Sequence, residues 1–193
     1  VFNVVTGTGP VAGEALVSHP GVRMVSFTGS TRVGHRVAEL AMAGLKRLHL
    51  ELGGKAPFVV FHDADLEAAI QGAVAASLIN TGQDCTAATR AYVHRSLYDR
   101  FVTGVAEVMD SVVLGDTLDE ATDLGPLISP TQQQKVAAMV DRAVAAGAKV
   151  ACGGFAPEGA GCFYRPTLVT GAAQDSEIVQ DEIFGPVLVV LPF

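Results

Sequence analysis

Short apolar runs alternate with helix-like segments along the whole chain, and this alternation restricts the folds open to it. The apolar run 24–30 precedes a segment of helical period at 31–43. The run 56–61 precedes a second such segment that reaches about residue 78, and 91–94 leads into a third. Parallel strands need such crossover connections, so the pattern predicts an α/β fold with a parallel sheet.

The remaining segments continue the same alternation. We expect helices at 97–113 and 130–146 with a loop between them, and strands at 2–5, 148–152 and 163–171. The twin glycines after Glu51 mark the expected boundary between two α/β units, which gives domains at 1–51 and 52–193.

The composition argues against several classes of function. The formal net charge is −7, and the Lys and Arg residues are scattered singly, so no basic patch for nucleic acid is expected. No apolar run reaches the roughly 18 residues that a membrane-spanning helix needs. The three cysteines show no metal-ligand spacing. We therefore expect no metal site, no membrane or nucleic-acid partner, and a reducing, cytoplasmic location.

Both ends of the sequence lie in apolar runs. The chain begins with VFNVVTG and closes with GPVLVVLPF, whereas domains seldom begin and stop in strands that look buried. We therefore expect an internal piece of a longer protein, incomplete at both ends.

Cys85 lies in NTGQDCTAATR, between a polar turn and the expected strand 91–94. A thiol at such a junction can face a cleft and act as a nucleophile if a base, a helix N-terminus or a cation favours the thiolate. Asp84 would oppose thiolate formation if it faced the sulfur, and an ordinary buried thiol is the alternative. Cys152 and Cys162 look structural.

Three further motifs carry chemistry. FTGSTRVG, at 27–34, reads as a strand, a glycine turn and a helix N-terminus, which suits a phosphate but equally a plain helix cap. ELGGK, at 51–55, places Glu51 at a strand end, as a general base or as a surface glutamate. EIFGPV, at 182–187, places Glu182 at a tight turn, where it could bind sugar hydroxyls or only begin the turn.

Together the four motifs, in this order, are similar to the NAD(P)-dependent aldehyde dehydrogenase superfamily, and the similarity runs over the whole chain. It implies a Rossmann-like aldehyde dehydrogenase fold. It also implies that Cys85 attacks an aldehyde carbonyl and that Glu51 activates the water that hydrolyses the resulting thioester, with removal of the thiol proton as a further role left open for Glu51. Because members of the superfamily carry an oxyanion-hole asparagine and part of the cofactor site in a segment before VFNVV, the resemblance implies that this chain alone is inactive or nearly so. Such an enzyme takes NAD, with NADP as the alternative.

The resemblance also implies the cofactor site. It implies that one set of residues binds the pyrophosphate at the helix N-terminus, a second lines the adenine pocket, and a third contacts the nicotinamide and its ribose. The residues for these three roles are, in turn, Gly29, Ser30, Val33 and Gly34; Gly9, Pro10 and Gly13; and Leu52, Glu182 and Phe184.

GQDCTAATR most resembles the branch that oxidises 4-aminobutanal and betaine aldehyde, and such a parent protein is expected to be a homodimer or homotetramer. Asp84 near the thiol suits cationic aldehydes, although it could instead turn away and cap a backbone N–H. Two alternatives stay open, namely a CoA-acylating relative and a non-catalytic remnant. Glu51 argues against the first, because a general base for water is needed only in hydrolysis.

Overall fold

The computed structural model describes all of residues 1–193, which form two compact units, Val1–Gly53 and Gly54–Phe193. Each unit is described by itself. Leu52, which the sequence assigned to the second domain, is the last residue of a strand in the first unit. No helix in either unit has the combination of length and hydrophobicity that crossing a bilayer requires.

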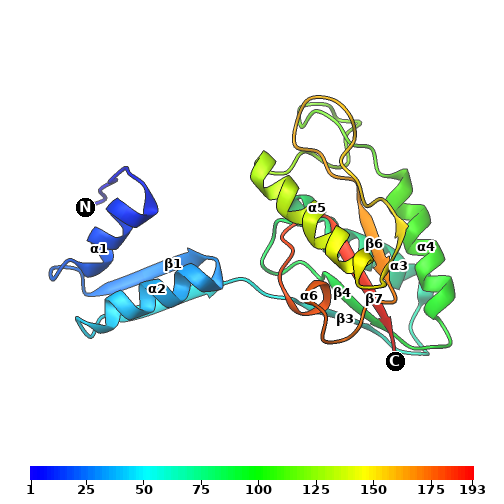
Figure 1. Cartoon of the computed structure of the whole chain (residues 1–193), viewed down its shortest axis with the longest axis horizontal. Helices are drawn as coiled ribbons and strands as arrows, with labels where there is room; N and C mark the ends of the chain where they lie inside the picture. Colours follow the sequence, from blue (N-terminus) through cyan, green and yellow to red (C-terminus); the bar gives the residue numbers. More distant parts are fainter. The chain divides into compact units, whose positions relative to one another are not determined.

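The first unit is built on two parallel strands with helices on one face. A π-helical turn, Gly9–Gly13, runs directly into a short helix. The other elements are α1 (Glu14–Ser18), β1 (Met24–Gly29), α2 (Thr31–Met42) and β2 (Arg47–Leu52). Strand β1 pairs with β2 from Met24 opposite Arg47 to Gly29 opposite Leu52. This is one β–α–β crossover, as the sequence predicts (Figure 1).

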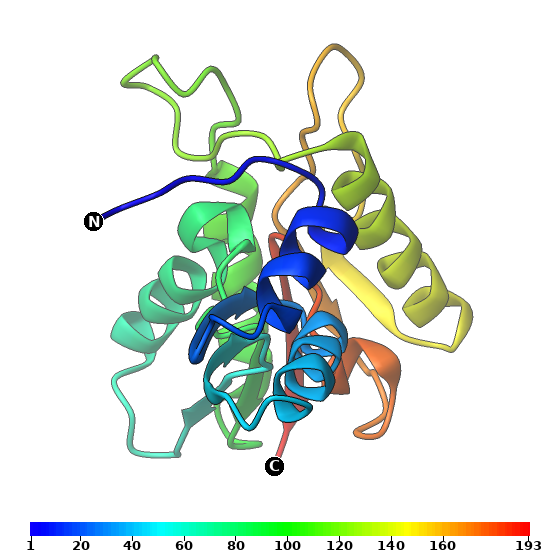
Figure 2. The ribbon, with the colours of Figure 1, turned by 90° about the vertical axis from the view of Figure 1, so that its left-hand side faces the viewer.

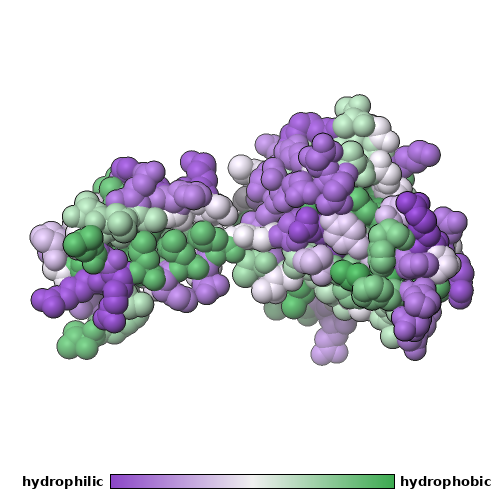
Figure 3. All heavy atoms as spheres, turned by 90° about the horizontal axis from the view of Figure 1, so that it is seen from below, coloured by the Kyte–Doolittle hydropathy of each residue, from purple (hydrophilic) through white to green (hydrophobic).

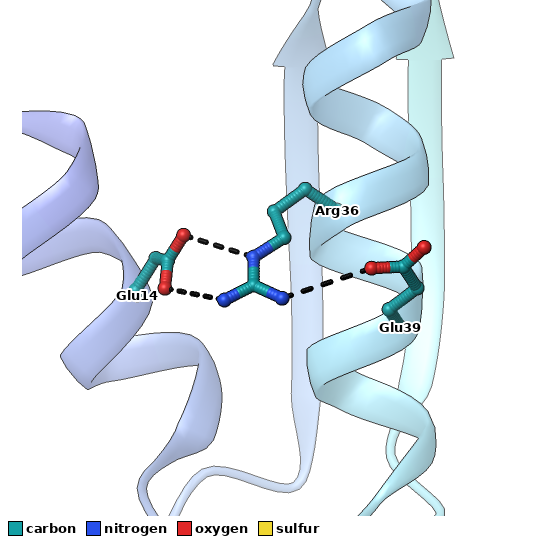
Figure 4. Close-up of polar contacts among 3 residues, drawn as sticks. All are labelled: Glu14, Arg36 and Glu39. Carbon is teal, nitrogen blue, oxygen red and sulfur yellow. Dashed lines mark hydrogen bonds and ion pairs between the residues drawn. The ribbon is translucent and has the colours of Figure 1, made fainter.

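The core of the first unit is small. Val17, Val37 and Ala41 of the two helices are buried against alternate residues of the strands. An ion pair joins the helices at the surface, where Arg36 Nε and Nη2 donate to the two carboxylate oxygens of Glu14 at 3.0 and 2.9 Å (Figure 4). Glu39 lies 3.7 Å from the same guanidinium. The exposed pair adds little stability, so the apolar face decides how the helices pack.

The second unit is a five-stranded sheet with the order β3-β4-β7-β6-β5. The first four strands are parallel, and β5 pairs with β6 in the antiparallel sense. The strands are β3 (Pro57–Val60), β4 (Arg90–Val93), β5 (Lys149–Cys152), β6 (Thr167–Thr170) and β7 (Val187–Pro192). The helices are α3 (Leu66–Leu78), α4 (Tyr98–Ser111), α5 (Pro130–Ala145) and α6 (Glu177–Gln180).

Helices cover both faces of this sheet (Figure 2). Side chains of α3 and α4 form one core with the sheet, and those of α5 and α6 form the other. The central strand β7 is buried from Val187 to Leu191, as its continuous apolar sequence predicts. The face of the second unit seen in Figure 3 is mixed, with hydrophilic residues over much of it and hydrophobic patches among them. The loops of this unit also expose Leu118, Ile128 and Phe155.

The helix predictions are confirmed more closely than the strand predictions. Asp65 caps α3 by accepting from the N–H of Ala68, and Ser129 caps α5 in the same way. The prediction of a strand at 2–5 is wrong, because these residues are exposed and pair with no other strand. The predicted parallel α/β architecture is confirmed, with β5 as an antiparallel edge strand that follows the long helix α5 and returns along β6.

Candidate active site

In the first unit the predicted residues gather at the carboxyl ends of β1 and β2. Gly29 ends β1 opposite Leu52, and Thr28 is paired with Glu51. Gly34, on the first turn of α2, packs so closely on Leu52 that an added Cβ would lie 2.5 Å from Leu52 Cδ2. The glycine therefore lets the helix lie directly over the strand end, which is where open α/β sheets bind ligands.

The N-terminus of α2 opens at this same edge. Ser30 is its N-cap, and its side chain accepts from the N–H of Val33 at 3.4 Å. Since the first N–H groups of a helix have no acceptor within it, those of Thr31 and Arg32 are available to an anion. Val33 is exposed. Glycine before the cap and exposed N–H groups fit a phosphate-bearing cofactor.

Gly9, Pro10 and Gly13 form the π-helical turn before α1. An added Cβ on Gly9 or Gly13 would meet nothing within 4 Å, so neither glycine is required by packing inside this unit. Both lie on an exposed or half-buried turn. The open space beside them is consistent with a flat ligand lying against the backbone.

In the second unit three motifs meet at the amino ends of parallel strands. Gly54 precedes β3, Cys85 precedes β4, and Glu182 precedes β7. The N–H of Gly54 donates to Glu182 Oε1 at 3.3 Å. An added Cβ on Gly54 would lie 3.4 Å from the carbonyl oxygen of Cys85. The fold thus brings together GGK, GQDC and EIFGP, which are far apart in the sequence.

The thiol of Cys85 is exposed on a tight turn. Asp84 Oδ1 accepts from the N–H and the hydroxyl of Thr86 at 2.6 and 2.5 Å, and the N–H of Ala87 donates to the Asp84 carbonyl. These bonds hold the pKa of the Asp84 carboxyl below its ordinary value. Asp84 therefore caps the turn, as one of the two sequence alternatives predicts, and the turn leaves the N–H of Cys85 unused.

The Cys85 turn is braced from both sides. Gln83 Oε1 accepts from the N–H of Ile128 at 2.9 Å, and Asn80 Nδ2 donates to the Gln83 carbonyl at 3.0 Å. Gly82 has a φ of +68°, and an added Cβ would lie 2.1 Å from the carbonyl oxygen of Gly185. Only glycine permits this contact between the cysteine loop and the EIFGP turn.

The EIFGP turn is held by a residue that the sequence analysis did not identify. Gln132, on the first turns of α5, donates from Nε2 to the carbonyls of Ile183 and Phe184 at 3.2 and 2.7 Å. Phe184 has a φ of +57°, which is strained for an aromatic residue. The long-range amide contacts fix that conformation, and no local sequence pattern could have indicated them.

Lys55 is the other residue that was missed. Its side chain is buried and its Nζ has no hydrogen-bond partner. Burial, and next the charge of Arg90, lower the pKa of the Lys55 ammonium to about 7, while Asp181 and Glu182 oppose that shift. The residue closes the ELGGK motif, so its position was visible in the sequence, but its burial was not.

The other two cysteines do not share the setting of Cys85. Cys152 is buried in β5 beside Met109, and burial raises the pKa of its thiol to about 11. Cys162 is half-buried against the α5 core. No group of three or more His, Cys, Asp or Glu side chains is arranged to hold a metal ion.

The structure is thus that of an α/β protein with a helix N-terminus whose first N–H groups lack acceptors in one unit and an exposed thiol on a braced turn in the other. The sequence matches, over residues 1–193, the family described as "Aldehyde dehydrogenase family". The chain belongs to this family.

Known relatives and structures agree with that membership. The chain is 45% identical to a betaine aldehyde dehydrogenase of Brucella anthropi and 42% identical to the NADP-dependent succinate-semialdehyde dehydrogenase of Escherichia coli, each match covering all of this chain and 40% of the relative. An aldehyde dehydrogenase of Bacillus cereus in complex with NAD⁺ is similar with a TM-score of 0.95 and 42% identity, over 97% of this chain and 38% of that one. The chain therefore spans about two fifths of the relatives it matches.

Proposed function

We propose that the protein carrying this chain oxidises an aldehyde to a carboxylic acid with NAD as cofactor, and that Cys85 is its nucleophile. The observation that carries the proposal is the exposed Cys85 thiol on a turn held against the EIFGP turn, with its N–H left out of the turn's own hydrogen bonds. That N–H would stabilise the oxyanion as the sulfur bonds to the carbonyl carbon.

The residues divide the reaction between them. The Cys85 thiolate adds to the aldehyde and gives a thiohemiacetal. Bound NAD would supply the hydride acceptor, so that a thioester remains on the sulfur. Glu51 would take a proton from water as its oxygen bonds to the thioester carbon. The carbon–sulfur bond then breaks, the thiolate leaves with the electron pair, and the acid is released.

The cofactor assignment follows the same division into units. In the first unit, Gly29, Ser30, Val33 and Gly34 would hold the pyrophosphate, while Gly9, Pro10 and Gly13 would line the adenine pocket. Leu52, Glu182 and Phe184 would border the nicotinamide and its ribose. We further propose that the two compact units correspond to the NAD-binding and catalytic domains. NAD is preferred over NADP by the resemblance of GQDCTAATR to the aminoaldehyde branch.

The proposed substrate is a cationic aldehyde such as betaine aldehyde or 4-aminobutanal. Asp84 supports this choice, because its lowered pKa keeps a negative charge next to the thiol. The named relatives act on a cationic and an anionic aldehyde at similar identity, so the relatives do not decide between the two substrate classes.

The test uses the native protein that contains this sequence. NADH formation is followed with betaine aldehyde, 4-aminobutanal and succinate semialdehyde, and the product is analysed with and without CoA. We expect the free acid in both cases, and no NADH from Cys85→Ser. The matched control is Cys162→Ser, which should retain turnover. An acyl-CoA product would support the CoA-acylating alternative, and activity in Cys85→Ser would refute the nucleophile assignment.

A further inference from the structure

Three side chains on one face of the first unit form a row of polar contacts that ends at Glu51. Ser26 Oγ lies 3.0 Å from His49 Nδ1, and His49 Nε2 lies 3.2 Å from Glu51 Oε1. Ser26 is directly opposite His49 in the parallel register, and Glu51 follows His49 by one strand repeat. All three therefore point to the same side of the sheet.

This face is the one that the helices of the unit do not cover. The alternate residues Val25, Phe27, Leu48 and Leu50 pack on the α1–α2 side. Ser26, His49 and Glu51 are exposed within the unit, with 55% and 59% of the His49 and Glu51 side chains accessible. These three side chains are thus not part of the core of the unit. Their contacts end at the Glu51 carboxylate.

The chemistry of the three groups fixes the direction of their hydrogen bonds. An ionised carboxylate only accepts, so the 3.2 Å contact between His49 Nε2 and Glu51 Oε1 favours the tautomer with the hydrogen on Nε2. A neutral imidazole then has its lone pair on Nδ1, which accepts from the Ser26 hydroxyl. Glu51 favours this tautomer, Ser26 orients the ring from the other side, and the imidazole lies against one oxygen of Glu51. The second carboxylate oxygen stays free to take a proton.

We propose that His49, oriented by Ser26, is a positioning residue for Glu51 in the hydrolysis of the Cys85 thioester. The proposal rests on the proposed function, since it assigns a role in the step for which Glu51 is the base. In the proposed mechanism Cys85 adds as the thiolate, so His49 acts through Glu51 only after the thioester has formed.

Two substitutions of His49 test the roles of its two ring nitrogens separately. The Gln amide nitrogen in His49→Gln stands near the place of Nε2 and can still donate to Glu51. The Asn amide in His49→Asn reaches only the place of Nδ1, so it can meet Ser26 but not Glu51. The Gln and Asn variants differ by one methylene, and both lack the imidazole. If His49 had only a structural role, His49→Asn would not be slower than His49→Gln in thioester hydrolysis.

The experiment measures acylation and deacylation separately in the native protein. The NADH burst reports thioester formation, and loss of the acyl adduct from the Cys85 peptide, followed by mass spectrometry, reports hydrolysis. We expect all variants to keep the burst. His49→Asn should slow adduct loss about tenfold or more, since a misplaced base costs rate steeply. His49→Gln should stay within about threefold of the wild type, and Ser26→Ala should fall between them.

A double-mutant cycle tests whether His49 acts through Glu51. In a Glu51→Gln background, His49→Asn should cause no further loss, because the group it positions is gone. Equal adduct lifetimes in His49→Asn, His49→Gln and the wild type would overturn the inference while leaving the dehydrogenase assignment intact. A further loss in the Glu51→Gln background would also overturn it. A wild type that forms neither NADH nor an acyl adduct would overturn the proposed function, and the inference with it.

Discussion

The N–H of Gly54 donates to the carboxylate of Glu182 at 3.3 Å, across 128 positions of the sequence. This bond ties the segment that follows the first unit to the turn that precedes the central strand β7. It lies beside the Cys85 loop, whose carbonyl oxygen faces Gly54. One carboxylate therefore orders the backbone at the edge where the proposed nicotinamide site lies.

The first prediction concerns Glu182. Glu182→Ala should lower the free energy of unfolding by only about 0.5 kcal/mol, because the N–H of Gly54 loses its acceptor at an exposed site where water can replace it. It should also weaken NADH binding by about tenfold if the carboxylate holds the ribose hydroxyls. Urea unfolding and NADH fluorescence titration measure the two effects.

Glu182→Gln is the matched control for that prediction. Its amide oxygen can still accept from Gly54, so stability should be restored while the ribose contact is only partly restored. An alanine variant that binds NADH as tightly as the wild type would remove Glu182 from the proposed cofactor site.

The second prediction concerns the thiols. Iodoacetamide near neutral pH should label Cys85 first, because its thiol is exposed. Cys152 should resist labelling, since it is buried and the pKa of its thiol is raised to about 11. Peptide mass spectrometry over a time course gives the order. Labelling of Cys152 at the rate of Cys85 would contradict the arrangement described for β5.

The third prediction concerns Asp84. Asp84→Asn keeps an oxygen that accepts from Thr86 but removes the charge. If that charge attracts cationic substrates, kcat/KM for betaine aldehyde should fall by roughly fivefold. The value for a neutral aldehyde of similar size should stay unchanged. An equal fall for both would mean that Asp84 only shapes the turn.

The sequence predicted local features well because they depend on nearby residues. The start of α5 at Pro130 follows from side-chain chemistry within one turn. The expected strand at 2–5 failed because an apolar run does not supply a pairing partner. The antiparallel direction of β5 was not predictable for a related reason, since nothing within Lys149–Cys152 encodes which neighbour it joins.

The candidate site was predictable as motifs but not as contacts. Family resemblance selected Cys85, Glu51 and Glu182, whereas their supports act at long range. Gln132 reaches the Phe184 carbonyl from α5, and His49 meets Ser26 across the β1–β2 register. Such pairs depend on the packing of whole elements, which a single sequence does not display.

The fourth prediction concerns pH and Lys55. Folding lowers the pKa of this ammonium from 10.5 to about 7, chiefly through burial. Between these values the unfolded chain binds a proton that the folded chain lacks, so stability rises with pH, by at most about 1.4 kcal/mol per unit. Below about pH 7 both states are charged, and the full cost of burial is present.

Lys55→Met should remove that dependence. The wild type should gain about 3 kcal/mol relative to the variant between about pH 7 and about pH 9.5, as measured by urea unfolding. A stability difference that does not change with pH would show that the Lys55 ammonium keeps its ordinary pKa.

The last prediction concerns the contact between the cysteine loop and the EIFGP turn. Gly82→Ala should lower the free energy of unfolding by about 2–4 kcal/mol, because φ is +68° and the new Cβ would lie 2.1 Å from the Gly185 carbonyl oxygen. Gly72→Ala on α3 is the control. Its Cβ would meet only the Phe58 ring at 3.6 Å, so it should stabilise the helix by about 0.5–1 kcal/mol. Urea unfolding of both variants decides the matter, and a Gly82→Ala protein as stable as the wild type would show that the two turns do not touch.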